Sequence, residues 1–128
     1  MAWQFSADVP VYRQIVSIIR RDIISGRFAP DEQIPSVRVL AFEASVNPNT
    51  MQRALTELEN EGLLVSKGTV GRFVTSRADV LGLAREKAKA EVLRDLVGKA
   101  RDLGISYGEM IEFVKSAELN ECEVKNNG

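Results

Sequence analysis

The sequence predicts a mainly α fold of the α+β class, in which an N-terminal winged helix-turn-helix precedes a small two-helix C-terminal part. Two helical patterns joined by a short turn occupy residues 36–61, and a glycine-containing hairpin pattern follows them directly. From Arg77 onward the chain has the pattern of a charged amphipathic helix. We therefore expect a winged helix-turn-helix domain at 1–75, a two-helix domain at 76–119 and a disordered tail at 120–128.

The first helix is expected from about Pro10 to Ser25. Proline suits the first helical turn, because its missing N–H has no partner there in any case. The apolar side chains recur at helical spacing and predict a buried stripe made of Tyr12, Ile15, Val16, Ile19 and Ile23. Gly26 ends this helix, and residues 31–34 form a short extended piece that Pro35 keeps out of helix.

The second and third helices form the helix-turn-helix. The second runs from Ser36 to about Ala44. The third follows Asn47, a good N-cap, with Pro48 at its first helical position, and Gly62 lies just past its end. The inner, apolar faces predicted for these two helices consist of Val37, Leu40, Ala41, Ala44, Met51, Ala54, Leu55 and Leu58.

The outer face of the third helix is polar and lacks acids. On a helical wheel it carries Asn49, Gln52, Arg53 and Thr56, and acids begin only at Glu57. Asparagine and glutamine bind adenine edges, and arginine binds guanine or phosphate, whereas a carboxylate would repel the phosphates that flank the major groove. The pattern favours a DNA recognition helix. A solvated surface face that happens to lack early acids is the alternative.

Two short strands are expected at 63–66 and 72–75, on either side of the glycines in KGTVG. A hairpin directly after the third helix is typical of a wing. Arg72 gives this wing a cation, and Arg38 places another on the exposed flank of the second helix, where that helix would meet the DNA backbone. The alternative for Arg38 is a surface ion pair with Glu43 or another acid.

The C-terminal part is predicted to contain a long charged helix that Gly104 closes and a last helix that begins with a capping box at Ser106–Glu109. Two helices cannot bury their apolar stripes alone, so they must pack on the first domain or on another chain. The stripe of the long helix, here called the apolar seam, consists of Leu81, Ala84, Ala88, Val92, Leu96, Ala100 and Leu103.

The composition argues against an enzyme, a metal protein and a membrane protein. The chain has no histidine, and its one cysteine, Cys122, lies in a polar tail without a neighbouring base. No phosphate loop or metal-ligand spacing occurs, so we expect no catalytic residue, no metal site and no cofactor. No segment has the length and apolarity of a membrane span, and the N-terminus lacks the pattern of a signal peptide. Together with the single cysteine, these features favour a cytoplasmic protein.

Motifs of one known family occur in order between residues 10 and 74. They are Pro10 with Tyr12 and Gln14-Ile15, Ile34-Pro35-Ser36-Val37-Arg38 with Leu40-Ala41, Asn47-Pro48-Asn49-Thr50, Leu58-Glu59 with Glu61-Gly62, and Gly71-Arg72-Phe73-Val74. With them the chain resembles the DNA-binding domain of the GntR family of bacterial transcription regulators. It departs from that family at Asp31, where glycine is common, at Ile34, where leucine is usual, and at Arg72 in the wing.

The resemblance implies a sequence-specific transcription regulator that acts as a repressor. It would bind an inverted-repeat operator in double-stranded DNA. The short C-terminal part is similar to that of the YtrA-like subfamily, whose members form homodimers through two helices, so the apolar seam is the expected dimerisation surface. A small-molecule effector is left open. The residues that the resemblance implies to contact DNA are Arg38, Asn47, Asn49, Thr50, Gln52, Arg53, Gly68, Gly71 and Arg72. Ser36 and Lys67 are added as candidates, and the alternative for Lys67 is a lysine that only keeps the surface soluble.

A net charge of −1 leaves a second class of function open. A winged helix can serve as a protein-interaction or assembly module without specific DNA binding, and the long helix would then be its binding surface. Salt dependence separates the two classes, because a protein that binds DNA releases counterions from the phosphates.

Overall fold

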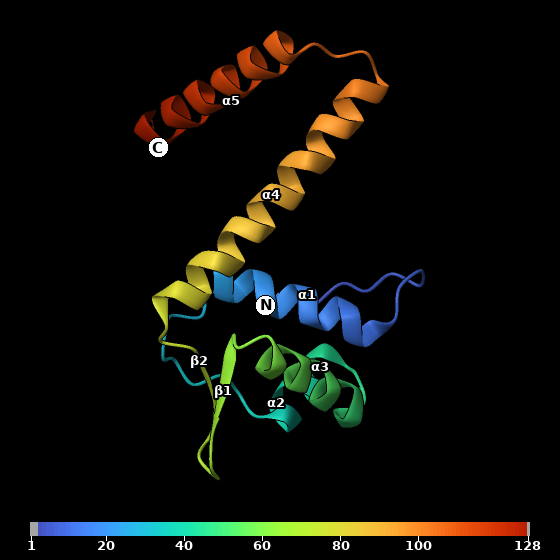
Figure 1. Cartoon of the computed structure of the whole chain (residues 1–128), viewed down its shortest axis with the longest axis vertical. Helices are drawn as coiled ribbons and strands as arrows, with labels where there is room; N and C mark the ends of the chain where they lie inside the picture. Colours follow the sequence, from blue (N-terminus) through green and yellow to red (C-terminus); the bar gives the residue numbers. More distant parts are fainter. Residues whose placement is uncertain (1–2, 128) are drawn as a thin grey trace. The chain divides into compact units, whose positions relative to one another are not determined.

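The computed structural model describes the backbone of residues 3–127 and the side chains of residues 3–118. These residues form five helices and one antiparallel sheet of two strands (Figure 1). The mainly α fold with a wing is therefore confirmed. The elements in chain order are α1 (Val11–Ile24), α2 (Val37–Ala44), α3 (Pro48–Asn60), β1 (Leu64–Lys67), β2 (Gly71–Val74), α4 (Ala78–Asp102) and α5 (Tyr107–Asn127).

The chain divides into two compact units, Met1–Glu86 and Lys87–Gly128. The first, called the winged unit, extends beyond the boundary expected after residue 75. The reason is apolar packing, because Val80, Leu81 and Ala84 in the first turns of α4 lie against the core of the winged unit. Leu81 and Ala84, two residues of the apolar seam, are thus partly buried within the chain itself.

The core of the winged unit is built from the inner faces of α1, α2 and α3 together with the hairpin. These faces are as predicted, except that Tyr12 and Val37 are only half-buried. Trp3 and Phe5 pack against the core from the N-terminal side, with their ring centroids 6.1 Å apart. The buried residues of this core are Ile15, Val16, Ile19, Ile23, Ile34, Leu40, Ala41, Ala44, Met51, Ala54, Leu55, Leu58, Leu63, Leu64 and Val74.

Side-chain caps fix where α2 and α3 begin. The Ser36 hydroxyl accepts a hydrogen bond from the backbone N–H of Val39 at 3.3 Å, and the Asn47 side-chain oxygen accepts one from Asn49 N–H at 2.8 Å. Each cap satisfies an N–H group that has no partner within its helix. Ser36 and Asn47, both candidate DNA contacts, therefore already have a structural role in the free protein.

The wing consists of β1, β2 and the turn 68–70 between them. The two strands pair from Leu64 opposite Val74 to Lys67 opposite Gly71. Both strands are shifted by one residue from the predicted ranges. β1 begins one residue later than predicted because Leu63 N–H donates to the Leu58 carbonyl at 3.1 Å, in the turn that follows α3.

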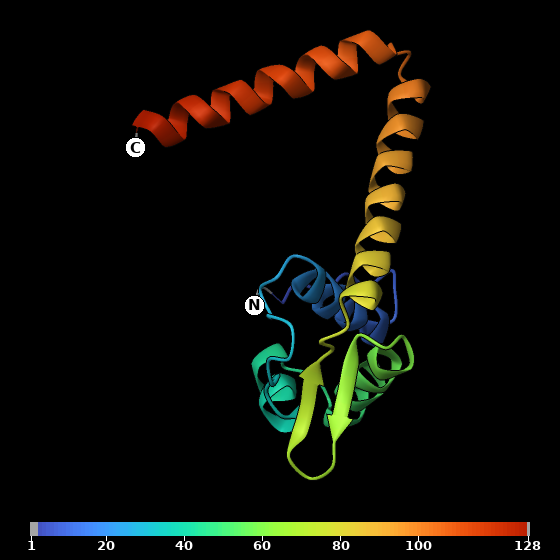
Figure 2. The ribbon, with the colours of Figure 1, turned by 60° about the vertical axis from the view of Figure 1, so that its left-hand side comes forward.

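The extended piece before α2 joins the free edge of β2 and ties the wing to the helices. Ile34 N–H donates to the Arg72 carbonyl at 3.0 Å, and Val74 N–H donates to the Glu32 carbonyl at 2.9 Å. The hairpin consequently lies alongside α2 and α3 (Figure 2), which is the arrangement that a winged helix-turn-helix requires.

Helices α2 and α3 end with a residue in the left-handed conformation. After α3 this residue is Gly62, with φ of 82°, and it pays no Cβ penalty. After α2 the same position is Ser45, with φ of 56°. Val46 N–H donates to the Ala41 carbonyl at 3.0 Å and fixes this geometry, so the serine is held in a conformation that its Cβ disfavours.

Replacing Ser45 with glycine is therefore expected to stabilise the winged unit by about 1 kcal/mol. Thermal unfolding would report this as a rise in Tm of roughly 4 °C. Ser45→Ala, which keeps a Cβ at the same φ, is the matched control and should not raise Tm. If Tm rises equally in both variants, the stabilisation comes from loss of the Ser45 hydroxyl and not from relief of the backbone conformation.

In the C-terminal unit, α4 ends at a left-handed Gly104, as predicted. Ile105 N–H donates to the Ala100 carbonyl at 2.9 Å across this end, and Ala100 is buried. The remaining seam residues leave much apolar surface uncovered within the described chain: Val92 is 66% exposed, Leu96 46% and Leu103 78%.

Helix α5 covers most of the segment that was expected to be a disordered tail. Its residues from 120 to 127 include good helix formers and no glycine or proline. The side chains of residues 119–128, among them the thiol of Cys122, lie outside the described residues. No helix in the described part of the chain combines the length and the apolarity that crossing a membrane needs.

Candidate nucleic-acid interface

The outer face of α3 is polar, exposed and free of carboxylates in its first two turns. Asn49, Gln52, Arg53 and Thr56 are all exposed, whereas Thr50 is half-buried. Gln52 donates from Nε2 to the Thr56 hydroxyl at 3.4 Å, which links two side chains one turn apart. These side chains can offer donors and acceptors to base edges along one helix face.

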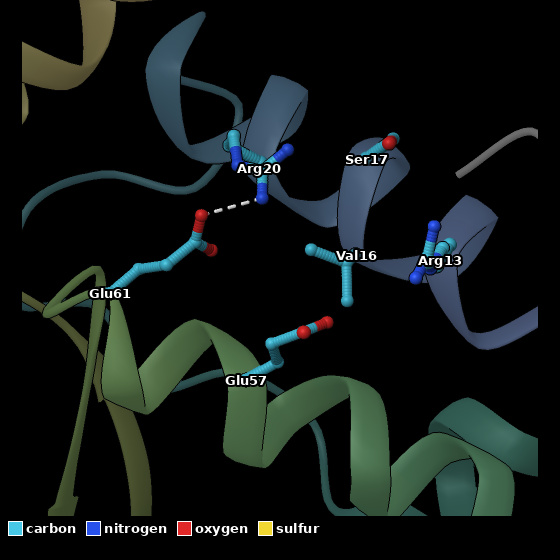
Figure 3. Close-up of a pocket in the computed structure, with 6 residues that line it drawn as sticks. All are labelled: Arg13, Val16, Ser17, Arg20, Glu57 and Glu61. Atoms are coloured by element: carbon cyan, nitrogen blue, oxygen red, sulfur yellow. Dashed lines mark hydrogen bonds and ion pairs between the residues drawn. The ribbon is translucent and has the colours of Figure 1, made fainter.

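The acids of α3 turn away from this face. Glu61 accepts from Arg20 of α1 at 2.6 Å, and Glu59 accepts from Arg72 of the wing. Figure 3 shows Glu57 and Glu61 pointing from α3 toward α1, where Arg13 and Arg20 line the same groove. Two of the late acids, Glu59 and Glu61, thus bind cations of the protein, and they tie the end of α3 to the wing and to α1.

Both cations of the wing lie beside carboxylates. The Lys67 ammonium lies 3.1 Å from an Asp31 carboxylate oxygen and 4.4 Å from the centre of the Phe73 ring. Arg72 Nε donates to Glu59 Oε1, and both side chains are partly buried. Each wing cation therefore has an acidic partner in the free protein.

Among the arginines of α1, α2, α3 and the wing, three guanidinium groups have no carboxylate at ion-pair distance in the described part of the chain. They belong to Arg13, Arg38 and Arg53. Arg38 is exposed on α2, and the pairing with Glu43 considered from the sequence does not occur among these residues. The cations that are left without an acid thus come from α1, α2 and the outer face of α3.

Arg53 has an aromatic neighbour that the sequence did not reveal. Its guanidinium carbon lies 3.7 Å from the centre of the Tyr12 ring of α1. Arg13 Nε donates to the Tyr12 hydroxyl at 3.1 Å, and this hydrogen bond raises the pKa of Arg13 above its ordinary value. Tyr12 was assigned to the buried stripe of its helix, because its contact with α3 crosses between elements and leaves no local pattern.

The wing tip is held by a side chain from the extended piece. Gln33 Nε2 donates to the Val70 carbonyl at 2.8 Å. Gly71 lies beside it with φ of 138°, and a Cβ there would come within 2.8 Å of Gln33 Nε2. Gly68 has φ of 55° with open space around it. The two glycines implied to contact DNA therefore first serve to close the turn.

A recess lies between the wing and the beginning of α2. Its lining includes Ser36, Arg38, Val70, Gly71 and Arg72. The first N–H groups of α2 and the Arg38 guanidinium suit an oxygen anion such as a phosphate. No group of three or more side chains suited to hold a metal ion occurs among the residues searched in the described chain.

Comparisons with known proteins place this site among transcription regulators. The model of "bacterial regulatory proteins, gntR family" matches residues 11–74. The uncharacterized HTH-type transcriptional regulator YhcF of Bacillus subtilis (strain 168) is 33% identical over 113 residues, 88% of this chain and 93% of that protein. The HTH-type transcriptional repressor YtrA of the same organism is 29% identical over 122 residues, 94% of each chain.

Solved structures agree with the sequence relatives. A GntR family transcriptional regulator from Listeria monocytogenes superposes with a TM-score of 0.81 and 28% identity, covering 88% of this chain and 98% of that one. AraR(DBD), crystallised in complex with operator ORX1, superposes with a TM-score of 0.53 and 30% identity over 56% of this chain and 93% of its own. A fold of this type therefore occurs bound to operator DNA.

Proposed function

The chain belongs to the gntR family of bacterial regulatory proteins, in its YtrA-like branch, and from this premise we propose that it represses transcription by binding an operator as a homodimer. The observation that carries the proposal is the outer face of α3, which is free of acids and holds Arg53 without a carboxylate partner. A relative of similar length in Bacillus subtilis is named a repressor. Occupancy of an operator near a promoter would exclude polymerase from it.

The operator is proposed to be an inverted repeat in double-stranded DNA. A symmetric dimer presents two copies of α3, and such dimers bind half-sites about 34 Å apart, one turn of DNA. We assign the dimer contact to the apolar seam of α4, chiefly to its exposed residues Val92, Leu96 and Leu103.

The contact residues divide into three groups. Asn49, Gln52 and Arg53 of α3 would reach base edges, since they share its exposed outer face. Thr50, Asn47, Ser36 and Arg38 would bind the backbone phosphates around the starts of α2 and α3. Lys67, Gly68, Gly71 and Arg72 would place the wing at the neighbouring minor groove.

The decisive experiment is fluorescence anisotropy of the purified protein with DNA from upstream of its own gene and with scrambled DNA, across a salt series. Tight binding to the native duplex alone, with a steep salt slope, would support a sequence-specific regulator. Absence of binding to either duplex at low salt would reject the proposal and favour the protein-interaction module instead.

Because Arg72 is paired with Glu59 and Arg38 has no carboxylate partner among the described residues, we expect the two arginines to contribute unequally to the salt dependence of DNA affinity. Arg38→Ala should lower the slope of log K against log salt by about one per protomer, because a free guanidinium replaces one counterion. Arg72→Ala should lower it by less, since Arg72 must leave Glu59 before it can bind a phosphate. If both variants lower the slope equally, the Arg72–Glu59 ion pair breaks on DNA binding without a measurable cost in free energy.

A further inference from the structure

We propose that Tyr12 of α1 is a positioning residue that fixes the direction in which Arg53 meets DNA, and thereby sets part of the sequence preference. This inference rests on the proposed function, because it assigns Arg53 to base reading. Its starting point is the stacking of the Arg53 guanidinium on the Tyr12 ring, with the guanidinium carbon 3.7 Å from the ring centre.

The geometry separates Arg53 from an ordinary surface arginine. A guanidinium carbon 3.7 Å from a ring centre is in van der Waals contact with the ring face, well inside the 6 Å or so over which such attraction acts. Arg13 approaches the same ring only to 5.9 Å and uses its Nε on the hydroxyl instead. The face of the Tyr12 ring is therefore contacted by Arg53, and Arg13 binds the hydroxyl.

Stacking leaves the functional atoms of Arg53 available. A guanidinium uses its flat face for an aromatic ring, whereas its N–H donors point outward in the plane. Among the described residues, no oxygen accepts a hydrogen bond from these donors, so all of them remain free for a guanine edge or a phosphate. A paired arginine such as Arg72 lacks this freedom.

Tyr12 can hold Arg53 steadily because it is itself fixed. It lies in the first turn of α1, and its half-buried ring is restricted independently of the hydroxyl, which accepts a hydrogen bond from Arg13 at 3.1 Å. A long arginine side chain otherwise samples many rotamers and loses that freedom on binding. Restricting it beforehand lowers this loss and favours the one direction in which the bidentate contact forms.

The test is a double-mutant cycle with Tyr12→Leu, Arg53→Ala and the double variant, together with Tyr12→Phe. Duplexes selected from a random-sequence library by the wild-type protein serve as the DNA. Affinity is measured by anisotropy, base preference by sequencing the duplexes that each variant selects, and folding by thermal unfolding. If Y12L fails to fold, Tyr12→Gln, which also lacks the ring, takes its place.

Y12L is expected to weaken binding to the selected duplex about 3- to 10-fold and to broaden base preference at the position that R53A also relaxes. Y12F, which keeps the ring and loses the hydroxyl, should stay within about 2-fold of wild type. In the R53A background, Y12L should cost nothing further, because Tyr12 acts through Arg53.

The outcomes separate the inference from the function on which it rests. Additive losses in the double variant would show a merely structural Tyr12 and overturn the inference, as would unchanged base preference in Y12L. A wild-type protein that enriches no sequence from the library would overturn the proposed function and the inference together. Selective DNA binding that R53A weakens and Y12L leaves intact would overturn the inference alone.

Discussion

Leu96→Glu is expected to convert the protein into monomers and to weaken operator binding by about 100-fold or more, because two linked half-site contacts become independent ones. Leu96 is 46% exposed and lies on the apolar seam of α4. A partner helix would bury it, and a glutamate there would be a buried charge without a partner. Sedimentation velocity would report the mass, and anisotropy the loss of affinity.

A matched control exists in the same helix. Leu83 is an exposed leucine outside the seam, with 75% of its surface exposed, so Leu83→Glu should leave both mass and affinity near wild type. The winged unit should keep its fold in Leu96→Glu, since Leu96 lies outside Met1–Glu86. Thermal unfolding would verify this. A Leu96→Glu protein that sediments as a dimer would refute the assignment of the interface to this part of α4.

Local patterns were enough to predict the helices of the winged unit and both faces of α3. Helical spacing placed Met51, Ala54, Leu55 and Leu58 in the core, where all four are fully buried. N-cap chemistry at Asn47 and a glycine at 62 located the ends of α3 to within a residue or two. Such signals are local in sequence, so they are readable without the fold.

Pairing between distant elements could not be predicted in the same way. Lys67 and Asp31 are 36 positions apart, and nothing in either local pattern indicates their ion pair. Tyr12 and Arg53 each fit a pattern of their own helix, an apolar stripe and a polar face. Only the packing of α1 on α3 brings the ring beneath the guanidinium. The first turns of α4 belong to the winged unit for a similar reason, because Val80, Leu81 and Ala84 pack on a core that is formed by elements distant in sequence.

The wing shows how a correct element can carry a different charge distribution from the one its sequence suggests. Its two cations were expected to face DNA, yet Asp31 and Glu59 neutralise them in the free protein. Such pairs hold the hairpin against α3 and the extended piece, at the expense of electrostatic attraction for phosphate. Long-range attraction to DNA would then fall to Arg13, Arg38 and Arg53, which lie on α1, α2 and α3.

Gln52→Ala should weaken binding to the preferred operator by about 1–3 kcal/mol and relax the base preference at one position of each half-site. Gln52 is exposed on the outer face of α3, and its amide can form two hydrogen bonds with an adenine edge. Its hydrogen bond to the Thr56 hydroxyl, at 3.4 Å, is long and therefore weak. Gln52 can exchange this bond for a base contact at little cost in free energy.

The measurement for this variant is affinity against a panel of duplexes that differ at single positions of the half-site. Asn60→Ala is the control, since Asn60 is an exposed amide in the last position of the same helix, among acids that DNA would repel. If Gln52→Ala weakens every duplex equally, Gln52 contacts the backbone and carries no sequence information. A loss confined to duplexes with one base at one position identifies the base that Gln52 reads. In the proposed symmetric dimer, the same base must then recur in the opposite half-site, which would fix the centre of the proposed inverted repeat.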